Sequence, residues 1–345
     1  MSRPTSVDLP LSGLSCLLFV IIGLLLSGCP VGDDDTDDDD AGDDDGADDD
    51  GADDDDDNTM ADDDLDEEFG TYVSSTDGWV EVVAGGRHGC GRRADGTVVC
   101  WGANLDGPVE SPTGSFQELG RGFWHTCAID KDGHVDCWGC GNEVPITINY
   151  GQCSAPPSVI YTLVGGGAMH SCGIRTDGTT SCWGCEEAPF SDQCEAPEEV
   201  LVSLSCGEYF SCGIGETGEI RCWGRDIYGE STPPPGSYSS VSAGSYHACA
   251  LDLAGEIDCW GDNDANQCDS PVGSFLSISS GMWHSCAIDG KDRVTCWGWS
   301  CYGQAHPPTD EFIQVSAGGE HTCGLRSDGH IVCWGLNSDG QSEPP

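Results

Sequence analysis

Apolar and polar positions alternate in short runs that return at nearly regular intervals through residues 69–345. In the last copy, two β-prone runs, residues 322–325 and 331–334, flank Asp328-Gly329. Asp-Gly between two such runs is a strong hairpin signal, because Gly accepts a positive φ without strain. An aromatic residue eleven positions before the first Cys of the hairpin, Phe312 in this copy, marks a third strand or its lead-in. Each copy therefore predicts a hairpin preceded by one further strand.

The unit recurs seven times. Each copy has a Gly, usually a His three residues later, then a Cys, nine residues, and Cys-Trp-Gly. Most first cysteines are 37 residues apart, so the repeat is hairpin-sized. Seven such units predict an all-β, closed and radially repeated structure.

Three repeated positions carry further expectations. Gly occupies the hairpin turn in six copies, whereas the sixth copy has Lys291-Asp292 there, so we expect its turn to be reshaped. A Gly lies five residues before the first Cys in all seven copies, which suits a bulge or a close backbone approach. The Trp of each Cys-Trp-Gly is expected to fill space between neighbouring units.

Centring each hairpin on its turn places its two cysteines opposite one another, where a disulfide can form. The alternative is metal ligation by Cys with the nearby His, but the C-x9-C spacing lacks the close C-x2-C pair of zinc sites. We predict seven hairpin disulfides: Cys90–Cys100, Cys127–Cys137, Cys172–Cys182, Cys212–Cys222, Cys249–Cys259, Cys286–Cys296 and Cys323–Cys333.

Two insertions, residues 139–157 and 184–198, lengthen the second and third copies. Each begins Cys-Trp-Gly-Cys and ends Gln-Cys, which predicts closure by Cys140–Cys153 and by Cys185–Cys194. Cys268 follows a similar Gln without a local partner, and Cys301 in the next copy is its best candidate. Cys206 is then left over and is predicted to be a buried free thiol that behaves as a small hydrophobe.

The N-terminus has Arg3, an apolar stretch from Leu11 to Leu26, and then Ser27-Gly28-Cys29. This order is typical of a secretory signal, and the apolar run is short for a membrane-spanning helix. Its end resembles a bacterial lipobox. The resemblance implies a lipoprotein signal peptide over residues 1–28, acylation of Cys29, and attachment to the cell envelope, at the outer membrane or cell surface. Plain secretion and an uncleaved anchor are the alternatives.

Residues 29–68 are dominated by Asp and cannot bury apolar surface, so they predict an extended, disordered tether. A low-affinity calcium sink is the alternative, although no fixed ligand spacing is present. The whole chain has a net charge of −49, and residues 69–345, with 36 acidic and 11 basic residues, have about −25. A surface this acidic repels nucleic-acid phosphates and anionic lipid headgroups. We therefore expect no nucleic-acid partner, and we expect contact with the membrane only through the lipid anchor.

The repeated residues Gly-x-x-His-(Ser/Thr)-Cys, the turn Asp-Gly, and Cys-Trp-Gly followed by Asn and Gly-Gln resemble the RCC1 family in its cysteine-bearing bacterial form. The last copy keeps nearly all of them, through Asn337, Gly340 and Gln341. The resemblance covers about residues 78–345 and implies a seven-bladed β-propeller with blades of about three strands. The chain ends just before another aromatic lead-in would begin, so we expect no strand to be exchanged between the first and last repeats.

The repeated His residues are interpreted as structural ties, since a residue in register around a ring is seldom a catalyst. We expect no catalytic residues, no metal site and no cofactor. Asp262, Asp264 and Asn266 have the spacing of a calcium loop but lack its later Gly and Glu, so they are interpreted as an ordinary loop.

Two apolar patches break the symmetry and are candidate anchors for a partner. They are Ile146, Ile148, Tyr150 and Phe190 in the insertions, and Trp299 with Tyr302 in the sixth copy. The sequence thus predicts a monomeric, lipid-anchored module that binds an unknown envelope or extracellular protein. An enzyme acting on envelope glycan or peptide and a structural envelope component are the alternatives. Nucleotide exchange, known for the best-studied relatives, is judged unlikely for an exported protein.

Overall fold

The computed structural model describes residues 73–74, 78–104, 107–140, 150–185 and 191–345. The part from Glu68 to Pro345 forms one compact unit. Within the described residues, no helix has the length and apolarity needed to cross a membrane. The predicted signal peptide, Cys29 and the Asp-rich tether lie outside the described residues and stay predictions.

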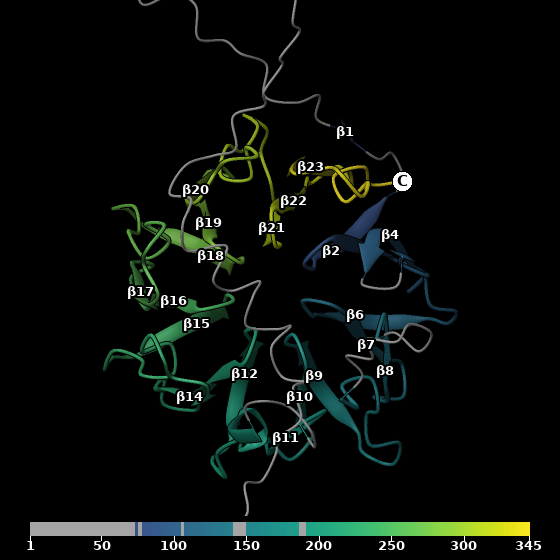
Figure 1. Ribbon diagram of the computed structural model, residues 1–345, viewed down its shortest axis with the longest axis vertical. Helices are drawn as coiled ribbons and strands as arrows, with labels where there is room; N and C mark the ends of the chain where they lie inside the picture. The colour runs from purple at the N-terminus through teal and green to yellow at the C-terminus, as the bar shows by residue number, and fades with distance from the viewer. Residues whose placement is uncertain (1–72, 75–77, 105–106, 141–149, 186–190) are drawn as a thin grey trace, which may run out of the picture. The chain divides into compact units, whose positions relative to one another are not determined.

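The unit consists of seven antiparallel sheets, which are the blades of a β-propeller. Each blade has three principal strands, numbered outward from the centre of the ring (Figure 1). Blade 1 comprises β2 (Trp79–Ala84), β3 (His88–Arg93), β4 (Val98–Asn104) and β5 (Gly107–Pro108); blade 2 comprises β6 (Phe116–Arg121), β7 (Thr126–Asp130) and β8 (Val135–Trp138); blade 3 comprises β9 (Tyr161–Gly166), β10 (Ser171–Arg175) and β11 (Thr180–Trp183); blade 4 comprises β12 (Leu201–Cys206), β13 (Phe210–Gly215) and β14 (Ile220–Gly224); blade 5 comprises β15 (Tyr238–Ala243), β16 (His247–Asp252) and β17 (Ile257–Gly261); blade 6 comprises β18 (Phe275–Ser280), β19 (His284–Asp289) and β20 (Val294–Gly298); blade 7 comprises β21 (Gln314–Ala317), β22 (His321–Leu325) and β23 (Ile331–Gly335) with β1 (Val73–Ser74). A short 3-10 helix, η1 (Ser191–Cys194), follows blade 3.

In five blades the aromatic lead-in begins the inner strand, and its side chain is buried between blades; blade 4 has Leu201 at this position, and in blade 7 the strand begins two residues after Phe312. Phe116, for example, packs with Val83 and Val98 of blade 1. A register shift follows directly in most inner strands, as between Phe116 and Glu118, and it turns the intervening residue outward. The core is therefore a series of similar clusters between adjacent blades rather than one central mass.

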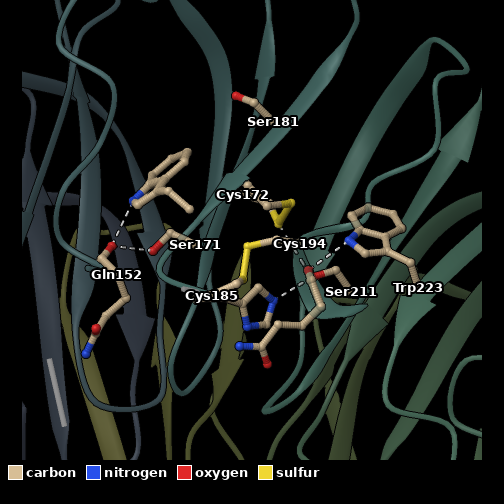
Figure 2. The surroundings of a disulfide bond; sticks show 12 residues. Gln152, Ser171, Cys172, Ser181, Cys185, Cys194, Ser211 and Trp223 are labelled. Atoms are coloured by element: carbon tan, nitrogen blue, oxygen red, sulfur yellow. Dashed lines mark hydrogen bonds between the residues drawn. A yellow bond between two sulfur atoms is a disulfide. The ribbon is translucent and has the colours of Figure 1, made fainter. Parts of the chain in front are cut away.

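All seven hairpins bring their two cysteines into direct opposition and join them by a disulfide, which confirms the predicted pairs. The insertion disulfides Cys140–Cys153 and Cys185–Cys194 are also present, and Figure 2 shows the second of them. Such short loops each restrict the unfolded chain by about 2–3 kcal/mol in the chain-entropy treatment.

The predicted Cys268–Cys301 disulfide is wrong, because Cys268 has a free thiol. Its Sγ lies 3.2 Å from the carbonyl oxygen of Asp262, and its backbone N–H donates to Asn263 Oδ1 at 2.8 Å. Asp262 occupies the position that Cys140 and Cys185 hold in their loops, directly after Trp-Gly. Hydrogen bonds within one loop thus hold Cys268 where the insertions use a disulfide. Cys206 is a buried free thiol, as predicted.

The turn of the sixth hairpin keeps its shape, contrary to expectation. Gly at the turn has a φ of 82° in blade 5, and Asp292 adopts 60° at the matching position of blade 6. The N–H of Asp292 donates to Asp289 O at 3.1 Å, as Gly255 N–H does to Asp252 O at 3.2 Å. Asp can replace Gly here because its short polar side chain tolerates the left-handed region better than most.

The Trp of each Cys-Trp-Gly joins neighbouring blades through its indole N–H as well as its ring. Six of these groups donate to a backbone carbonyl in the loop of the preceding blade, as Trp183 does to Gln152 O at 2.8 Å. Ser171 donates to the same carbonyl at 2.9 Å (Figure 2). The buried side chain of Gln152 accepts the N–H of Tyr150, which fixes this carbonyl in place. The Gly-Gln of the repeat therefore has a structural role at the blade interface.

The ring is closed by an exchanged strand, which corrects the expectation that none would be shared. Val73 and Ser74, from before the first repeat, pair with Cys333 and Val332 of β23. A segment that precedes the repeats therefore completes the last blade.

Candidate functional site

The seven turns between inner and middle strands surround the centre of the ring, and their first residue is the repeated Gly. A Cβ on Gly244 would stand 2.4 Å from the carbonyl oxygen of Gly281 in the next blade, and one on Gly281 would stand 2.5 Å from Gly318 O. The next turn residue donates across the same interface, as Met282 N–H does to Gly318 O at 3.0 Å. Only Gly permits this approach, which is the close backbone approach predicted for it.

The repeated His side chains are interblade ties and do not form a catalytic cluster. Five donate or accept through Nε2 to a Ser or Thr hydroxyl of the next blade at 2.7–2.8 Å, as His88 does with Thr126. Burial lowers the pKa of all six from 6.5 to about 3 or 4. A neutral imidazole sealed inside an interface has no access to substrate.

Two interfaces depart from this tie in a matched way. Phe210 replaces the His where the next blade offers Ala248 in place of a hydroxyl, and both lie in one apolar cluster. His321 keeps its imidazole but faces the blade that has Gly89 at the hydroxyl position. Neither ring nitrogen of His321 has a hydrogen-bond partner among the described residues.

Arg121 and Cys206 occupy the last position of their inner strands, where the other blades have Ala, Gly or Ser. The Arg121 guanidinium reaches from blade 2 across the ring and donates to the carbonyls of Ala243, Ser280 and Ala317 at 2.9, 2.5 and 2.7 Å. Burial lowers its pKa to about 10 and raises the pKa of the Cys206 thiol to about 11. One side chain therefore ties blades 5, 6 and 7 to the opposite side of the ring.

Potential ligand atoms of His170, Cys172 and Cys206 lie within 4.8 Å of one another, the one such group in the part of the chain that is described. The Cys172 sulfur is already bonded to Cys182, and His170 is tied to Ser211 at 2.8 Å. A disulfide sulfur is not the thiolate that a metal needs. This arrangement therefore does not favour a metal site.

An arc of aromatic side chains lies beside the centre of the ring across blades 4, 5 and 6. We define the aromatic arc by its residues: Tyr209, Tyr228, Tyr246, Trp283, Trp299 and Tyr302. Ring centroids are 5.9 Å apart for Tyr228–Tyr246, 5.1 Å for Tyr246–Trp283 and 5.4 Å for Trp299–Tyr302. Trp299 N–H donates to Trp283 O at 2.9 Å, which joins the last pair to the rest. None of these side chains is fully buried.

Arg225 organises one end of the arc. Its guanidinium carbon lies 4.3 Å from the Tyr246 ring centroid and 5.3 Å from that of Tyr209. Its Nε donates to Glu230 Oε1 at 2.7 Å, in an almost completely buried ion pair. The other oxygen of Glu230 accepts Tyr228 N–H at 2.7 Å, so this carboxylate is fully used. A cation stacked on several rings holds them in fixed orientations.

A small cavity of about 10 Å³ opens among the ring glycines and is also lined by Arg121, Phe123, Glu208 and Met282. The Glu208 side chain is only 8% exposed. Burial raises the pKa of Glu208, opposed by hydrogen bonds from Tyr246 and Tyr209 and by the charge of Arg225. The unrepeated carboxylates Glu208 and Glu230 do not make an acid–base pair, since Glu230 has both oxygens engaged.

Three of the predicted anchors lie in the described residues, and their role in binding stays a prediction. Trp299 and Tyr302 make an edge-to-face contact and form one end of the aromatic arc. Tyr150 is partly buried beside Gln152 in its insertion. Ile146, Ile148 and Phe190 lie outside the described residues. The loop from Asp262 to Gln267 is held by its own hydrogen bonds, including Gln267 Nε2 to Asp262 Oδ2 at 3.1 Å, as an ordinary loop would be.

Sequence reasoning missed Tyr209, Tyr246, Trp283 and the buried Glu208. A signal was present, because the position directly before the repeated His is aromatic in blades 2, 4, 5 and 6. When the repeats are aligned, these residues all lie on the turns between the inner and middle strands. What the sequence lacked was the spatial arrangement that places them beside two loops, the one with Tyr228 in blade 4 and the one with Trp299 and Tyr302 in blade 6.

The fold and its ties define a disulfide-reinforced seven-bladed β-propeller built from a single repeat. The family model for the regulator of chromosome condensation (RCC1) repeat matches six segments, residues 79–107, 122–144, 201–230, 238–267, 275–304 and 312–341. The chain therefore belongs to the RCC1-repeat propellers, and its unmatched third repeat has the same strands and disulfide as the others. A search of curated proteins found no match to the chain.

Solved structures agree on the architecture. The ectodomain of the Arabidopsis thaliana receptor kinase ACR4 is 25% identical, with a TM-score of 0.60 over 79% of this chain and 99% of that one. The ectodomain of the Physcomitrella patens receptor kinase CR4 is 26% identical, with a TM-score of 0.60 over 77% and 74%. Yeast RCC1 (Prp20), solved bound to Kap60, is 16% identical, with a TM-score of 0.56 over 69% and 78%, and supports the fold alone.

Proposed function

We propose that this protein is a binding module of the cell envelope that recognises another protein through the aromatic arc. The observation that carries the proposal is the arc itself, six partly exposed aromatic side chains held by Arg225 and by backbone ties across three blades. Pre-ordered aromatic residues are effective anchors, because little side-chain entropy is lost when a partner covers them. The proposal assigns the chain no catalytic role.

Attachment through Cys29 and an extended Asp-rich tether would hold the propeller away from the membrane, on the sequence argument given above. The disulfides are consistent with an oxidising compartment. Two similar propellers are ectodomains of receptor kinases, which supports a binding role for this propeller. These likenesses support the class of function and leave the partner unidentified.

The binding role can be tested by cross-linking capture from envelope and secreted proteins with the full mature chain. We expect a specific, saturable partner that is lost when Tyr246→Ala and Trp283→Ala are combined. Leu276→Ala is the matched control, because Leu276 is 68% exposed in blade 6 but lies outside the arc. Equal capture by the double variant and the wild type would contradict the proposal.

The anchor is tested separately by metabolic labelling with a fatty acid. The wild-type chain should incorporate the label and sediment with membranes, whereas Cys29→Ser should do neither. Labelling that persists in the variant would show that Cys29 is not the attachment site.

A further inference from the structure

Glu208 differs from its counterparts at the same turn position, which are Gly86, Phe123, Ala168, Ser245, Met282 and Gly319. It is the one acidic side chain among the residues that line the central cavity. Burying a carboxylate costs free energy unless hydrogen bonds or an opposite charge compensate it. A carboxylate placed by one repeat out of seven therefore needs an explanation that the fold does not supply.

The carboxylate is only half satisfied. Hydroxyls of Tyr246, Tyr209 and Ser245 hydrogen-bond to it. Its Oε2 atom, however, is buried and has no hydrogen-bond partner within the described part of the chain. An acceptor left unpaired inside a lined cavity indicates a donor that arrives from outside.

The local charges favour a cationic donor. Arg225 is the cation whose charge acts on Glu208, but it is paired with Glu230 at 2.7 Å. Arg121, on the same cavity, points its guanidinium at three backbone carbonyls and is not among the charges that shift Glu208. A cation that enters the cavity would therefore pair with Glu208 and favour its ionised form, which burial alone disfavours. The surrounding domain, at about −25, adds a long-range attraction for cations.

The size of the cavity selects among cations. About 10 Å³ is room for roughly one water-sized group, which suits a primary ammonium and is too little for a planar guanidinium. Phe123 lines the same cavity, and Tyr246 hydrogen-bonds to Glu208 through its hydroxyl.

From this juxtaposition we propose that Glu208, in the lining of the central cavity, receives the ammonium group of a lysine side chain presented by a partner protein. The proposal rests on the proposed function and names the chemistry by which the partner would be recognised. The aromatic arc would cover the apolar part of the partner, and Glu208 would take the charge at its edge.

The pH dependence of such binding follows from the groups that face Glu208. Tyr209 and Tyr246 have raised pKa values and stay neutral, and the other groups close by are those of the Arg225–Glu230 ion pair. Burial raises the pKa of Glu208, so its carboxylate loses charge as the pH falls towards that pKa. Lysine remains protonated throughout, and the affinity should therefore weaken in acid.

The test uses the full mature chain and the single-lysine peptide acetyl-Gly-Lys-Gly-amide, followed by tryptophan emission. The Asp-rich tether contains no Trp, so peptide bound there is silent. At about 0.15 M salt, screening beyond about 8 Å also weakens attraction to the tether. We expect a saturable change with this peptide and none with its Nε-acetyl-lysine counterpart.

Glu208→Gln keeps the shape and one acceptor but removes the charge, and should weaken binding at least about tenfold. Glu320→Gln is the matched control, since Glu320 precedes His321 on the corresponding turn of blade 7 but does not line the cavity. Equal affinity for the lysine and acetyl-lysine peptides would overturn the proposal, and this comparison needs no variant. Equal affinity of Glu208→Gln and wild type would overturn it as well.

A single water that completes Oε2 would give no saturable response to either peptide and would also overturn the proposal. In that case, capture that still depends on Tyr246 and Trp283 would leave the binding role of the arc standing. If the peptide gave no saturable response and capture did not depend on Tyr246 and Trp283, both the proposed function and the proposed lysine recognition would be overturned.

Discussion

The blade interfaces on the two sides of the ring are built from one repeat but hold the inner strands differently. From blade 4 round to blade 1, a Ser at the fifth inner-strand position accepts the backbone N–H of the sixth residue of the next blade. We call these the stapled interfaces, formed by Ser205, Ser242, Ser279 and Ser316. From blade 1 to blade 4, the same position has Val83, Gly120 and Gly165.

In the second group, the interface at Gly120 brings two backbones close together in place of a hydroxyl. A Cβ on Gly120 would stand 2.5 Å from Val164 O, so the neighbouring strand occupies the space of the missing side chain. We call these three the unstapled interfaces. Arg121, which stands on their side, ties the inner-strand carbonyls of blades 5, 6 and 7. The two sides therefore depend on each other, and the aromatic arc lies over the stapled side.

Low pH should destabilise the stapled and the unstapled interfaces together, and this is the largest effect that we expect. Each side has three buried His residues whose pKa values are lowered to about 3 or 4, so the folded protein binds fewer protons than the unfolded chain below about pH 6.5. The penalty grows as the pH falls and levels off only below the folded pKa values. Between about pH 7 and about pH 5, the free energy of unfolding should fall by more than about 5 kcal/mol, measured by denaturation at each pH.

The control for acid lability is His321→Phe, which copies Phe210 at an interface without a facing hydroxyl. This variant should show a pH slope that is smaller by one proton. An unfolding free energy that does not change across the range would contradict the buried neutral state of these side chains.

Removing the cross-ring tie should weaken the stapled side from a distance. Arg121→Met keeps the length of the side chain and loses three charge-assisted hydrogen bonds, so it should cost about 2–3 kcal/mol in thermal or chemical denaturation. Hydrogen exchange should increase in blades 5, 6 and 7 more than in blade 3. Arg121→Lys retains the positive charge but loses the forked guanidinium, so its stability should lie between that of the wild type and that of Arg121→Met. Exchange that rises only in blade 2 would mean that the tie is local.

Removing a Ser from a stapled interface and adding one to an unstapled interface should show how differently the two kinds of interface are held. Ser242→Ala removes one staple and should cost about 1 kcal/mol. Gly120→Ser adds a staple residue where the neighbouring backbone leaves no room, and should cost more than about 2 kcal/mol. A stable Gly120→Ser protein would show that the close approach is incidental.

The smallest effect concerns the apolar interface between blades 4 and 5. Phe210→His alone should cost about 2 kcal/mol, because its imidazole would face Ala248 without a partner. Ala248→Ser added to it should recover about 1 kcal/mol by restoring the tie seen between His247 and Ser285. A double-mutant cycle measures this coupling, and strict additivity of the two changes would argue against a direct bond.

Much of the fold could be predicted because it is encoded within single repeats. The hairpin, its turn Gly and the opposition of Cys323 and Cys333 depend on residues at most ten positions apart. Repetition then amplified a short-range signal seven times. Cys268 was mispaired for the same reason, since its spacing resembled that of the insertion cysteines while the partner position after Trp260-Gly261 carries Asp262.

By itself, the sequence determined the repeat, the disulfide frame of its hairpins and the structural use of its His and Trp side chains, since these follow from local spacing and residue chemistry. Only the tertiary structure decided how the ring closes, which carbonyls Arg121 reaches, and that Tyr246 stands between Glu208 and Trp283, in contact with both. Arg121 and Ala317 are separated by 196 residues and Trp101 and Gln341 by 240, and sequence periodicity contains no information about which blades face one another. The binding surface depends on that order, because it is assembled from unrepeated side chains that only ring closure brings together.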